Sequence, residues 1–198
     1  RFAQLYYRPM NDTDVLRHFR ESGALLEGHF RLSSGLHSSG YLQCALVLQH
    51  PARAEALGAG IAAATRAWGA NVVLSPALGG IVIGQEVARA LGVRAIFAER
   101  TDGALALRRG FALSSEDRVL VVEDVLTTGG STRETIAVAE AHGATVVGAA
   151  SIMDRSGGLH GLSVPFAGLC PMNVPAYTEE TCPLCQQGVP VTKPGSRR

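Results

Sequence analysis

Between residues 71 and 155 the sequence alternates short apolar runs with segments of helical periodicity. The apolar runs are NVVLSPA (71–77), VRAIFAER (93–100), RVLVVEDVL (118–126) and TVVGAASIMDR (145–155). Between them lie the helical segments IVIGQEVARALG (81–92) and STRETIAVAEAHG (131–143). Strands that are apolar at successive positions are expected where helices cover both faces of a sheet. The pattern predicts an α/β fold with a mostly parallel, twisted sheet flanked by helices and joined by right-handed crossovers.

The segments around this region are predicted to complete one domain. A helix is expected over residues 13–22, capped by Asp12 or Thr13, and another from Pro51 to Gly69. The turn-rich stretch SSGLHSSG (33–40) lies between two strand-like pieces, GHFRL (28–32) and YLQCALVL (41–48), and predicts a hairpin. From residue 164 onward the chain is rich in proline and is expected to wrap the surface. We therefore predict a single domain over 1–198, with a parallel-sheet core at 51–158 and hood and tail segments at 1–50 and 159–198.

Charge and hydropathy exclude several classes of function. The formal net charge of the 198-residue chain is only +1, so no global field attracts nucleic acid or an anionic membrane. No run of apolar residues is long enough for a membrane span, and the first residues lack the apolar centre of a signal peptide. Four cysteines are too few for a disulfide framework in a chain of this size. We expect a soluble, cytoplasmic protein without a nucleic-acid or membrane partner.

The stretch VLVVEDVLTTGGSTRE (119–134) carries the clearest functional pattern. Two carboxylates, Glu123 and Asp124, are expected where the strand ends, at the rim where parallel α/β sheets bind ligands. A loop of glycines and hydroxyl residues then enters a helix, whose first amides form an anion site. Such a loop suits a phosphate monoester, and the carboxylates suit sugar hydroxyls or a bound Mg²⁺. The alternative is a simple helix cap followed by a plain turn. The loop is not a nucleotide-binding P-loop, because no Gly-Lys-Ser/Thr follows.

This stretch closely resembles the phosphoribosyl-pyrophosphate motif of type I phosphoribosyltransferases. The resemblance implies that Glu123 and Asp124 contact the ribose hydroxyls. It also implies that the loop cradles the 5′-phosphate through Thr127, Thr128, Gly129, Gly130, Ser131 and Thr132. The fold implied is that of the same family.

Two further segments resemble orotate phosphoribosyltransferases in particular. The run HFRLSSGLHSSGYLQ (29–43) is similar to the segment that supplies base and phosphate contacts, which implies base-side roles for Ser33 and Tyr41. SIMDRSGG (151–158) is similar to the segment whose arginine meets the carboxylate of orotate, here Arg155. A guanidinium fork suits a planar carboxylate, although an ion pair with Asp154 or a surface position is the alternative. The resemblance also places Thr127 beside the base.

The sequence departs from the family pattern at basic positions. Ser33 and Leu36 stand where lysine and arginine are usual, and Gly79 stands where a lysine usually contacts the pyrophosphate. The catalytic loop, usually rich in lysine, is AERTDGALALRRGF (98–111) here. Arg100 fits a basic position of the family. Arg108 and Arg109 are our own candidates for the same role, with an ordinary hairpin arm as the alternative.

The chemistry that the resemblance implies is displacement of pyrophosphate from the anomeric carbon by an orotate nitrogen. The candidate catalytic residues are Asp124, Arg100, Arg108 and Arg109, which would position the substrates and neutralise the leaving group. Mg²⁺ is the expected cofactor, held through substrate oxygens and water and not directly by the protein. A homodimer is expected, because the family's catalytic loop commonly reaches the neighbouring subunit.

Two other functions remain open on the sequence alone. One is a phosphoribosyl-pyrophosphate-sensing regulator that binds nucleic acid, favoured by the missing lysines and opposed by the near-neutral charge. The other is a purine phosphoribosyltransferase, opposed by Arg155, since purine bases bring no carboxylate.

The tail contains CPLC, in which Cys182 and Cys185 have the spacing of zinc ligands. Cys170 is a candidate third ligand, and among tail histidines only His160 offers a fourth. Unpaired thiols in a packed turn are the alternative. The other histidines are interpreted as single residues, none with a partner set that suggests a catalytic dyad: His18, His29, His37, His50 and His142.

Overall fold

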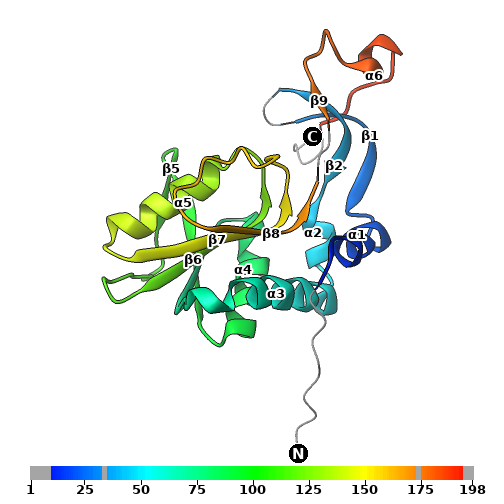
Figure 1. Cartoon of the computed structure of the whole chain (residues 1–198). Helices are drawn as coiled ribbons and strands as arrows, with labels where there is room; N and C mark the ends of the chain where they lie inside the picture. The colour runs from blue at the N-terminus through cyan, green and yellow to red at the C-terminus, as the bar shows by residue number, and fades with distance from the viewer. Residues whose placement is uncertain (1–9, 33–34, 173–174, 194–198) are drawn as a thin grey trace, which may run out of the picture.

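A computed structural model describes residues 10–32, 35–172 and 175–193. Figure 1 shows a main body built on a large sheet, from which a smaller unit projects at one end. The large sheet has six strands in the order β5-β4-β3-β6-β7-β8, and all neighbours are parallel except β4 and β5. The predicted mostly parallel α/β sheet is therefore confirmed.

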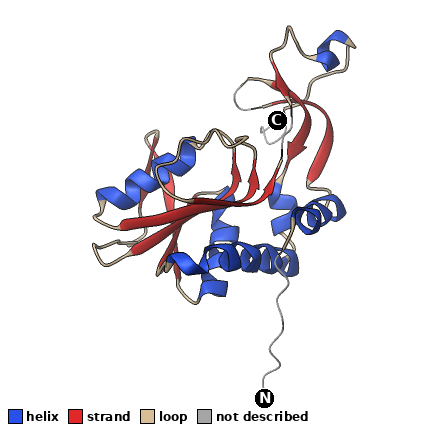
Figure 2. Cartoon of the chain, viewed as in Figure 1, coloured by secondary structure: helices blue, strands red, loops and turns tan. Residues whose placement is uncertain are grey.

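The main body contains most of the regular structure (Figure 2). Its strands are β3 (Val72–Pro76), β4 (Arg94–Thr101), β5 (Ala104–Leu107), β6 (Arg118–Leu126), β7 (Thr145–Asp154) and β8 (Phe166–Pro171). Its helices are α1 (Asp12–Glu21), α2 (Cys44–Leu48), α3 (Pro51–Thr65), α4 (Gly79–Leu91) and α5 (Gly130–Ala141), with a 3-10 turn η1 (Arg66–Trp68) after α3.

Two apolar cores lie on opposite faces of this sheet. Helices α3 and α4 cover one face, and α5 covers the other (Figure 1). Successive residues of a strand point to opposite faces, and β6 obeys this rule. Leu120 and Val122 lie in the core with α3 and α4, whereas Val119 and Val121 lie in the core with α5. The continuous apolar run of β6 is thus explained by burial on both faces.

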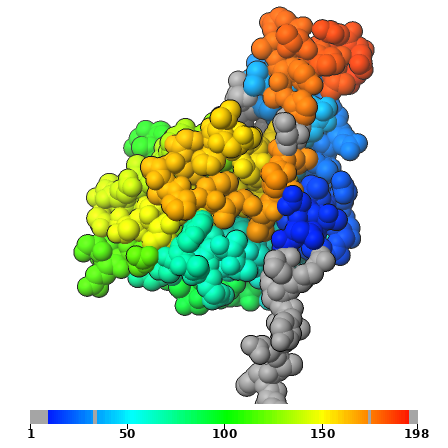
Figure 3. Space-filling model, in the orientation of Figure 1, coloured from blue at the N-terminus to red at the C-terminus, as the bar shows by residue number. Residues whose placement is uncertain are grey.

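The projecting unit comprises residues 25–42 and 175–193, and we call it the hairpin module. Its sheet has the order β1-β2-β9, formed by β1 (Leu25–Arg31), β2 (His37–Leu42) and β9 (Ala176–Tyr177), and a short helix α6 (Pro183–Gln186) follows. Figure 3 shows the C-terminal part of the module, in orange and red, standing clear of the main body beside the blue N-terminal hairpin. The predicted hairpin is confirmed, and the tail joins it as a third strand.

The structure differs from the sequence-based expectation in local details. Strand β6 spans the predicted run 118–126, so the two carboxylates lie within the strand and not at its end as expected. Residues 44–48 form a short helix instead of strand, because Cys44, Val47 and Leu48 bury one helical face. Helix α1 is capped by Asn11 in a capping box with Asp14, not by Asp12 or Thr13.

The large sheet also extends past the predicted core boundary at residue 158. Strand β8 pairs in parallel with β7 at the edge of the sheet. The proline-rich segment therefore contributes a strand before it reaches the hairpin module. Among the described residues, no helix is long and apolar enough to cross a bilayer.

Candidate active site

A cavity of about 580 Å³ lies between the hairpin module and the carboxyl ends of β6 and β7. Five of the residues predicted to bind substrate line it: Tyr41, Asp124, Thr127, Thr128 and Arg155. The remaining lining residues are Leu32, Leu36, Leu42, Gln43, Cys44, Val125, Ser156, Leu159 and Ala176. Segments far apart in sequence thus meet in one cavity, at the sheet edge where ligand sites of parallel α/β folds are expected.

The two adjacent carboxylates of β6 point to opposite faces of the sheet. Glu123 faces α5, where its Oε2 accepts a hydrogen bond from the hydroxyl of Thr132. Asp124 faces the cavity and α4, and the Cys44 thiol lies within hydrogen-bonding reach of it. The pair predicted to act together on a ribose is therefore divided, and only Asp124 lines the cavity.

Burial shifts the protonation of both acids. It raises the pKa of Glu123 to about 7, and hydrogen bonds from Thr132 and Ser131 only partly oppose this rise. Burial also raises the pKa of Asp124, although hydrogen bonds from the Val125 amide and the Cys44 thiol act to lower it. A cation or a polarised hydroxyl group would stabilise the charged form of Asp124 and reverse this effect.

The loop after β6 has the geometry of an anion site. Gly129 caps α5 with φ +75°, and no side chain caps the first turn of this twelve-residue helix. A Cβ at Gly129 would lie 2.7 Å from the carbonyl oxygen of His160, so glycine is required there. Arg133 fixes the loop by donating hydrogen bonds to the carbonyls of Thr128 (2.9 Å) and His160 (2.6 Å). The uncapped amides are therefore held at the cavity rim, where a phosphate group would complete them.

Arg155 lies opposite this loop with its guanidinium group in the cavity. Its backbone amide donates to the carbonyl of Leu126 at 2.8 Å, which anchors the residue at the end of β7. The predicted alternative, an ion pair with Asp154, does not form, because Asp154 Oδ1 accepts hydrogen bonds from the amide and hydroxyl of Ser156. Within the described residues no carboxylate pairs with Arg155. Burial lowers its pKa, while the Tyr41 phenol acts in the opposite direction.

The chain has close relatives among characterised protein families. Residues 46–160 match the phosphoribosyl transferase domain family. The orotate phosphoribosyltransferase of Pelotomaculum thermopropionicum is 51% identical over 189 residues, which are 96% of this chain and 100% of that protein. That of Carboxydothermus hydrogenoformans is 54% identical over 187 residues, 93% of this chain and 98% of its own. The chain belongs to the orotate phosphoribosyltransferase family.

A solved structure supports the same assignment. The crystal structure of the orotate phosphoribosyltransferase from Aeropyrum pernix is 26% identical to this chain, with a TM-score of 0.65. The match covers 80% of this chain and 93% of that one. The resemblance predicted from the sequence is thus confirmed for both the family and the fold.

Gly79, the position at which family members usually carry lysine, lies against Asp124. A Cβ at Gly79 would lie 2.7 Å from Asp124 Oδ2, so a longer side chain conflicts with this orientation of the carboxylate. Gly79 and Asp124 also line a second hollow of about 380 Å³, which adjoins the first. With glycine in place of lysine at position 79, the Asp124 carboxylate therefore lies in space that a side chain would otherwise occupy.

The three predicted catalytic arginines lie at the β4–β5 hairpin and just after it, and none is among the residues that line either hollow. Arg100 forms an ion pair with Glu134 of α5 at 2.7 Å, and Arg109 forms one with Glu99. Arg109 also lies over the ring of Phe97, 5.9 Å from its centroid. This segment forms a β4–β5 hairpin, which agrees with the alternative interpretation of an ordinary hairpin arm. A catalytic role for these arginines stays a prediction.

Two other predictions concern the hairpin module. Ser33, predicted on the base side, lies outside the described residues. Cys182 and Cys185 lie in the module together with His29 and His37, whereas Cys170 is buried in β8 near the Asp12 carbonyl and His160 packs on Phe166. The interpretation of His29 and His37 as single residues was therefore wrong. Their pairing depends on the hairpin and on the return of the tail, which no local sequence pattern reveals.

Proposed function

We propose that this chain transfers the phosphoribosyl group of phosphoribosyl pyrophosphate to orotate, giving orotidine 5′-monophosphate and pyrophosphate. The observation that carries the proposal is the position of Arg155. Its guanidinium fork faces the same cavity as Asp124 and the loop after β6 (127–132), which we call the phosphate loop. Arg155 has no carboxylate partner within the described residues. A carboxylated base is the ligand that would supply one.

The residues of the cavity divide into a base side and a sugar-phosphate side. Arg155 would bind the orotate carboxylate, with Tyr41 beside the base and Thr127 between base and ribose. The uncapped amides of α5 would bind the 5′-phosphate, and Asp124 would bind the ribose hydroxyls. Catalysis then consists of holding the base nitrogen against the anomeric carbon, with the leaving group on the opposite side, in a site from which water is excluded.

The cavity also fits a Mg²⁺ ion carried by the substrate. Mg²⁺ in phosphate chemistry is held by one or two carboxylates together with substrate oxygens and water. Asp124 offers one such carboxylate, while Glu123 is turned toward Thr132. When bound, the ion would neutralise the departing pyrophosphate. Mg²⁺ is therefore the expected cofactor, and Asp124 is the carboxylate of the cavity that would meet it.

We further propose a homodimer in which each subunit lends basic residues to the other. Because the predicted catalytic arginines do not line the cavity of their own chain, we expect them to act in the cavity of a neighbouring chain. In mixtures of Arg100→Ala and Arg155→Ala subunits, each defect lies in a different half of the shared site. If the site is shared, each mixed dimer has one intact site of two, so an equimolar mixture recovers about a quarter of wild-type activity after subunit exchange. No recovery would show that each chain uses its own residues.

The first experiment follows orotate absorbance with Mg²⁺ and phosphoribosyl pyrophosphate. Parallel reactions contain uracil, adenine, hypoxanthine or xanthine. Mg²⁺-dependent loss of orotate alone supports the proposal. Turnover of another base would keep the chemistry but refute the role of Arg155. No turnover, with phosphoribosyl-pyrophosphate binding retained, would support the regulator instead, and nucleic-acid binding with a steep salt dependence would then be tested.

A further inference from the structure

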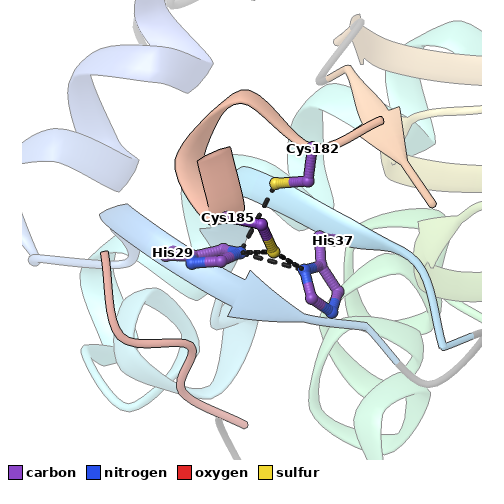
Figure 4. A group of neighbouring side chains, drawn as sticks. All are labelled: His29, His37, Cys182 and Cys185. Carbon is purple, nitrogen blue, oxygen red and sulfur yellow. Dashed lines mark hydrogen bonds between the residues drawn. The ribbon is translucent and has the colours of Figure 1, made fainter. Parts of the chain in front are cut away.

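Four metal-binding side chains converge in the hairpin module, away from the cavity. They come from three elements: His29 from β1, His37 from β2, and Cys182 and Cys185 from the turn that forms α6. Figure 4 shows all four side chains pointing toward one point between the hairpin and α6. One ligand atom from each residue lies within 4.8 Å of all the others.

The spacing of these atoms approaches that of a tetrahedral site. Ligand atoms about 2.0–2.3 Å from a zinc ion lie about 3.3–3.8 Å from one another. In this structure His29 Nε2 lies 3.0 Å from His37 Nδ1, 3.5 Å from Cys182 Sγ and 3.7 Å from Cys185 Sγ. The distance from His37 Nδ1 to Cys185 Sγ is 3.1 Å. Small outward shifts of the side chains would open the centre for one ion.

A hydrogen bond orients the His29 ring so that its Nε2 atom can bind a metal ion. Its Nδ1 lies 2.7 Å from the carbonyl oxygen of Val189, which can only accept a hydrogen bond. Nδ1 must therefore carry the proton, and Nε2 presents its lone pair to the cluster. A backbone carbonyl on the second nitrogen is the usual partner of a metal-binding histidine.

The hairpin module lacks an apolar centre of its own. Apart from Leu25 and Leu42 at its base, no described residue of the module belongs to either apolar core. Its most buried side chains include Cys182 (0% exposed), His37 (3%) and His29 (4%). Small units that cannot build a sufficient core are commonly held together by metal ions or disulfides. A disulfide between Cys182 and Cys185 would leave the two convergent histidines unexplained.

We propose a structural zinc site whose ligands are His29, His37, Cys182 and Cys185. Two thiolates and two imidazoles in a closed tetrahedral set select zinc, and no position is open for a substrate. The ion joins the tail to the β1–β2 hairpin. It adds to the backbone hydrogen bonds that link Thr192 with His29 and Arg31, each 2.8 Å long.

The site also has a consequence for the cavity. The hairpin that carries both histidine ligands also contributes Leu32, Leu36 and Tyr41 to the cavity wall. Loss of zinc is expected to loosen this wall while the six-stranded sheet stays folded, because the described part of the module contributes only Leu25 and Leu42 to its apolar cores. This second consequence rests on the proposed function, whereas the metal content does not.

Metal analysis of the full chain, purified without chelator and dialysed, tests the site directly. We expect about one equivalent of zinc per chain. The Cys182→Ser/Cys185→Ser double variant should lose it, and Cys170→Ala, a cysteine outside the cluster, should retain it. Less than about half an equivalent in the wild-type protein, even after incubation with zinc, would overturn the proposal. So would equal zinc content in the wild type and the double variant.

A measurement on the wild-type chain avoids variants that fail to fold. After removal of zinc by a chelator, addition of Co²⁺ should give the intense visible bands of tetrahedral cobalt together with thiolate charge-transfer absorption. Absence of both bands, or a spectrum of octahedral cobalt without thiolate ligands, would refute the ligand set. Zinc-free protein should retain the circular dichroism of the main body and show a KM for orotate raised several-fold. An unchanged KM would refute the link to the cavity but not the site.

Discussion

Replacement of Arg155 by alanine should selectively abolish recognition of the orotate carboxylate. A guanidinium group that binds a carboxylate through two charge-assisted hydrogen bonds in a half-buried site contributes about 3 kcal/mol. At 1.36 kcal/mol per factor of ten, kcat/KM for orotate should fall by about 100-fold or more. KM for phosphoribosyl pyrophosphate should change little, because the phosphate loop and Asp124 are untouched.

The variant should fold normally. Apart from its backbone hydrogen bond to Leu126, Arg155 makes no hydrogen bond or ion pair within the described residues, so truncation leaves no buried partner unsatisfied. We expect Tm to shift by less than about 3 °C. Arg155→Lys keeps the charge but loses the fork, and should recover only part of the activity. Arg17→Ala, which removes an exposed i,i+3 ion pair with Asp14 on α1, is the matched control and should behave as wild type.

Steady-state kinetics with each substrate varied in turn provide the assay, with uracil as the comparison ligand. Uracil lacks the carboxylate, so its inhibition constant should be the same in wild type and Arg155→Ala. A fall in kcat/KM for orotate of less than about fivefold would refute the role of Arg155, because water would then bind the orotate carboxylate about as well as the guanidinium group does. An equal rise in KM for both substrates would instead indicate a structural role.

Three further predictions concern the sugar-phosphate side. Gly129→Ala should weaken phosphoribosyl-pyrophosphate binding by at least about tenfold in calorimetry and lower Tm, because φ +75° and the close carbonyl of His160 exclude a methyl group. Gly79→Ala should lower kcat with little change in Tm, because the methyl would displace the side-chain carboxylate of Asp124 and not the backbone. The free energy of unfolding should fall between pH 4.5 and about 7, because the folded protein holds a proton on Glu123 that the unfolded chain releases. The contribution of Glu123 should be no more than about 3 kcal/mol, and the fall should shrink by this amount in Glu123→Gln, as denaturant titrations at several pH values would show.

Local sequence predicted the features whose residues lie on one strand–loop–helix unit. The run from Val119 to Arg133 contains its own strand, acids and loop, so its pattern was sufficient to predict the strand–loop–helix unit on which Asp124, Thr127 and Thr128 line the cavity. Arg155 was added by the resemblance of SIMDRSGG (151–158) to a family segment. It lines the same cavity because it directly follows the neighbouring strand, and parallel strands end at the same edge of a sheet.

Features that depend on distant segments were predicted poorly. His29 and Cys182 are separated by 153 positions in the chain. They meet only because β9 pairs with β2 and the tail then returns over β1. Neither His29 nor His37 lies in a recognisable metal-ligand motif, and only the two cysteines of CPLC indicated a metal site. The short helix α2 was also missed, since five residues carry too little periodicity to separate helix from strand.

The division of the acidic pair follows from the extension of β6. Had the strand ended at Val122, both acids would lie in a loop and could turn toward the same ligand. Because pairing with β7 continues to Leu126, alternation forces Glu123 beneath the phosphate loop and Asp124 into the cavity. The hydrogen bond from Thr132 to Glu123 then ties the start of α5 to the sheet. We therefore expect different tasks for the two acids: Asp124 would contact the sugar, and Glu123 would support the loop proposed to hold its phosphate.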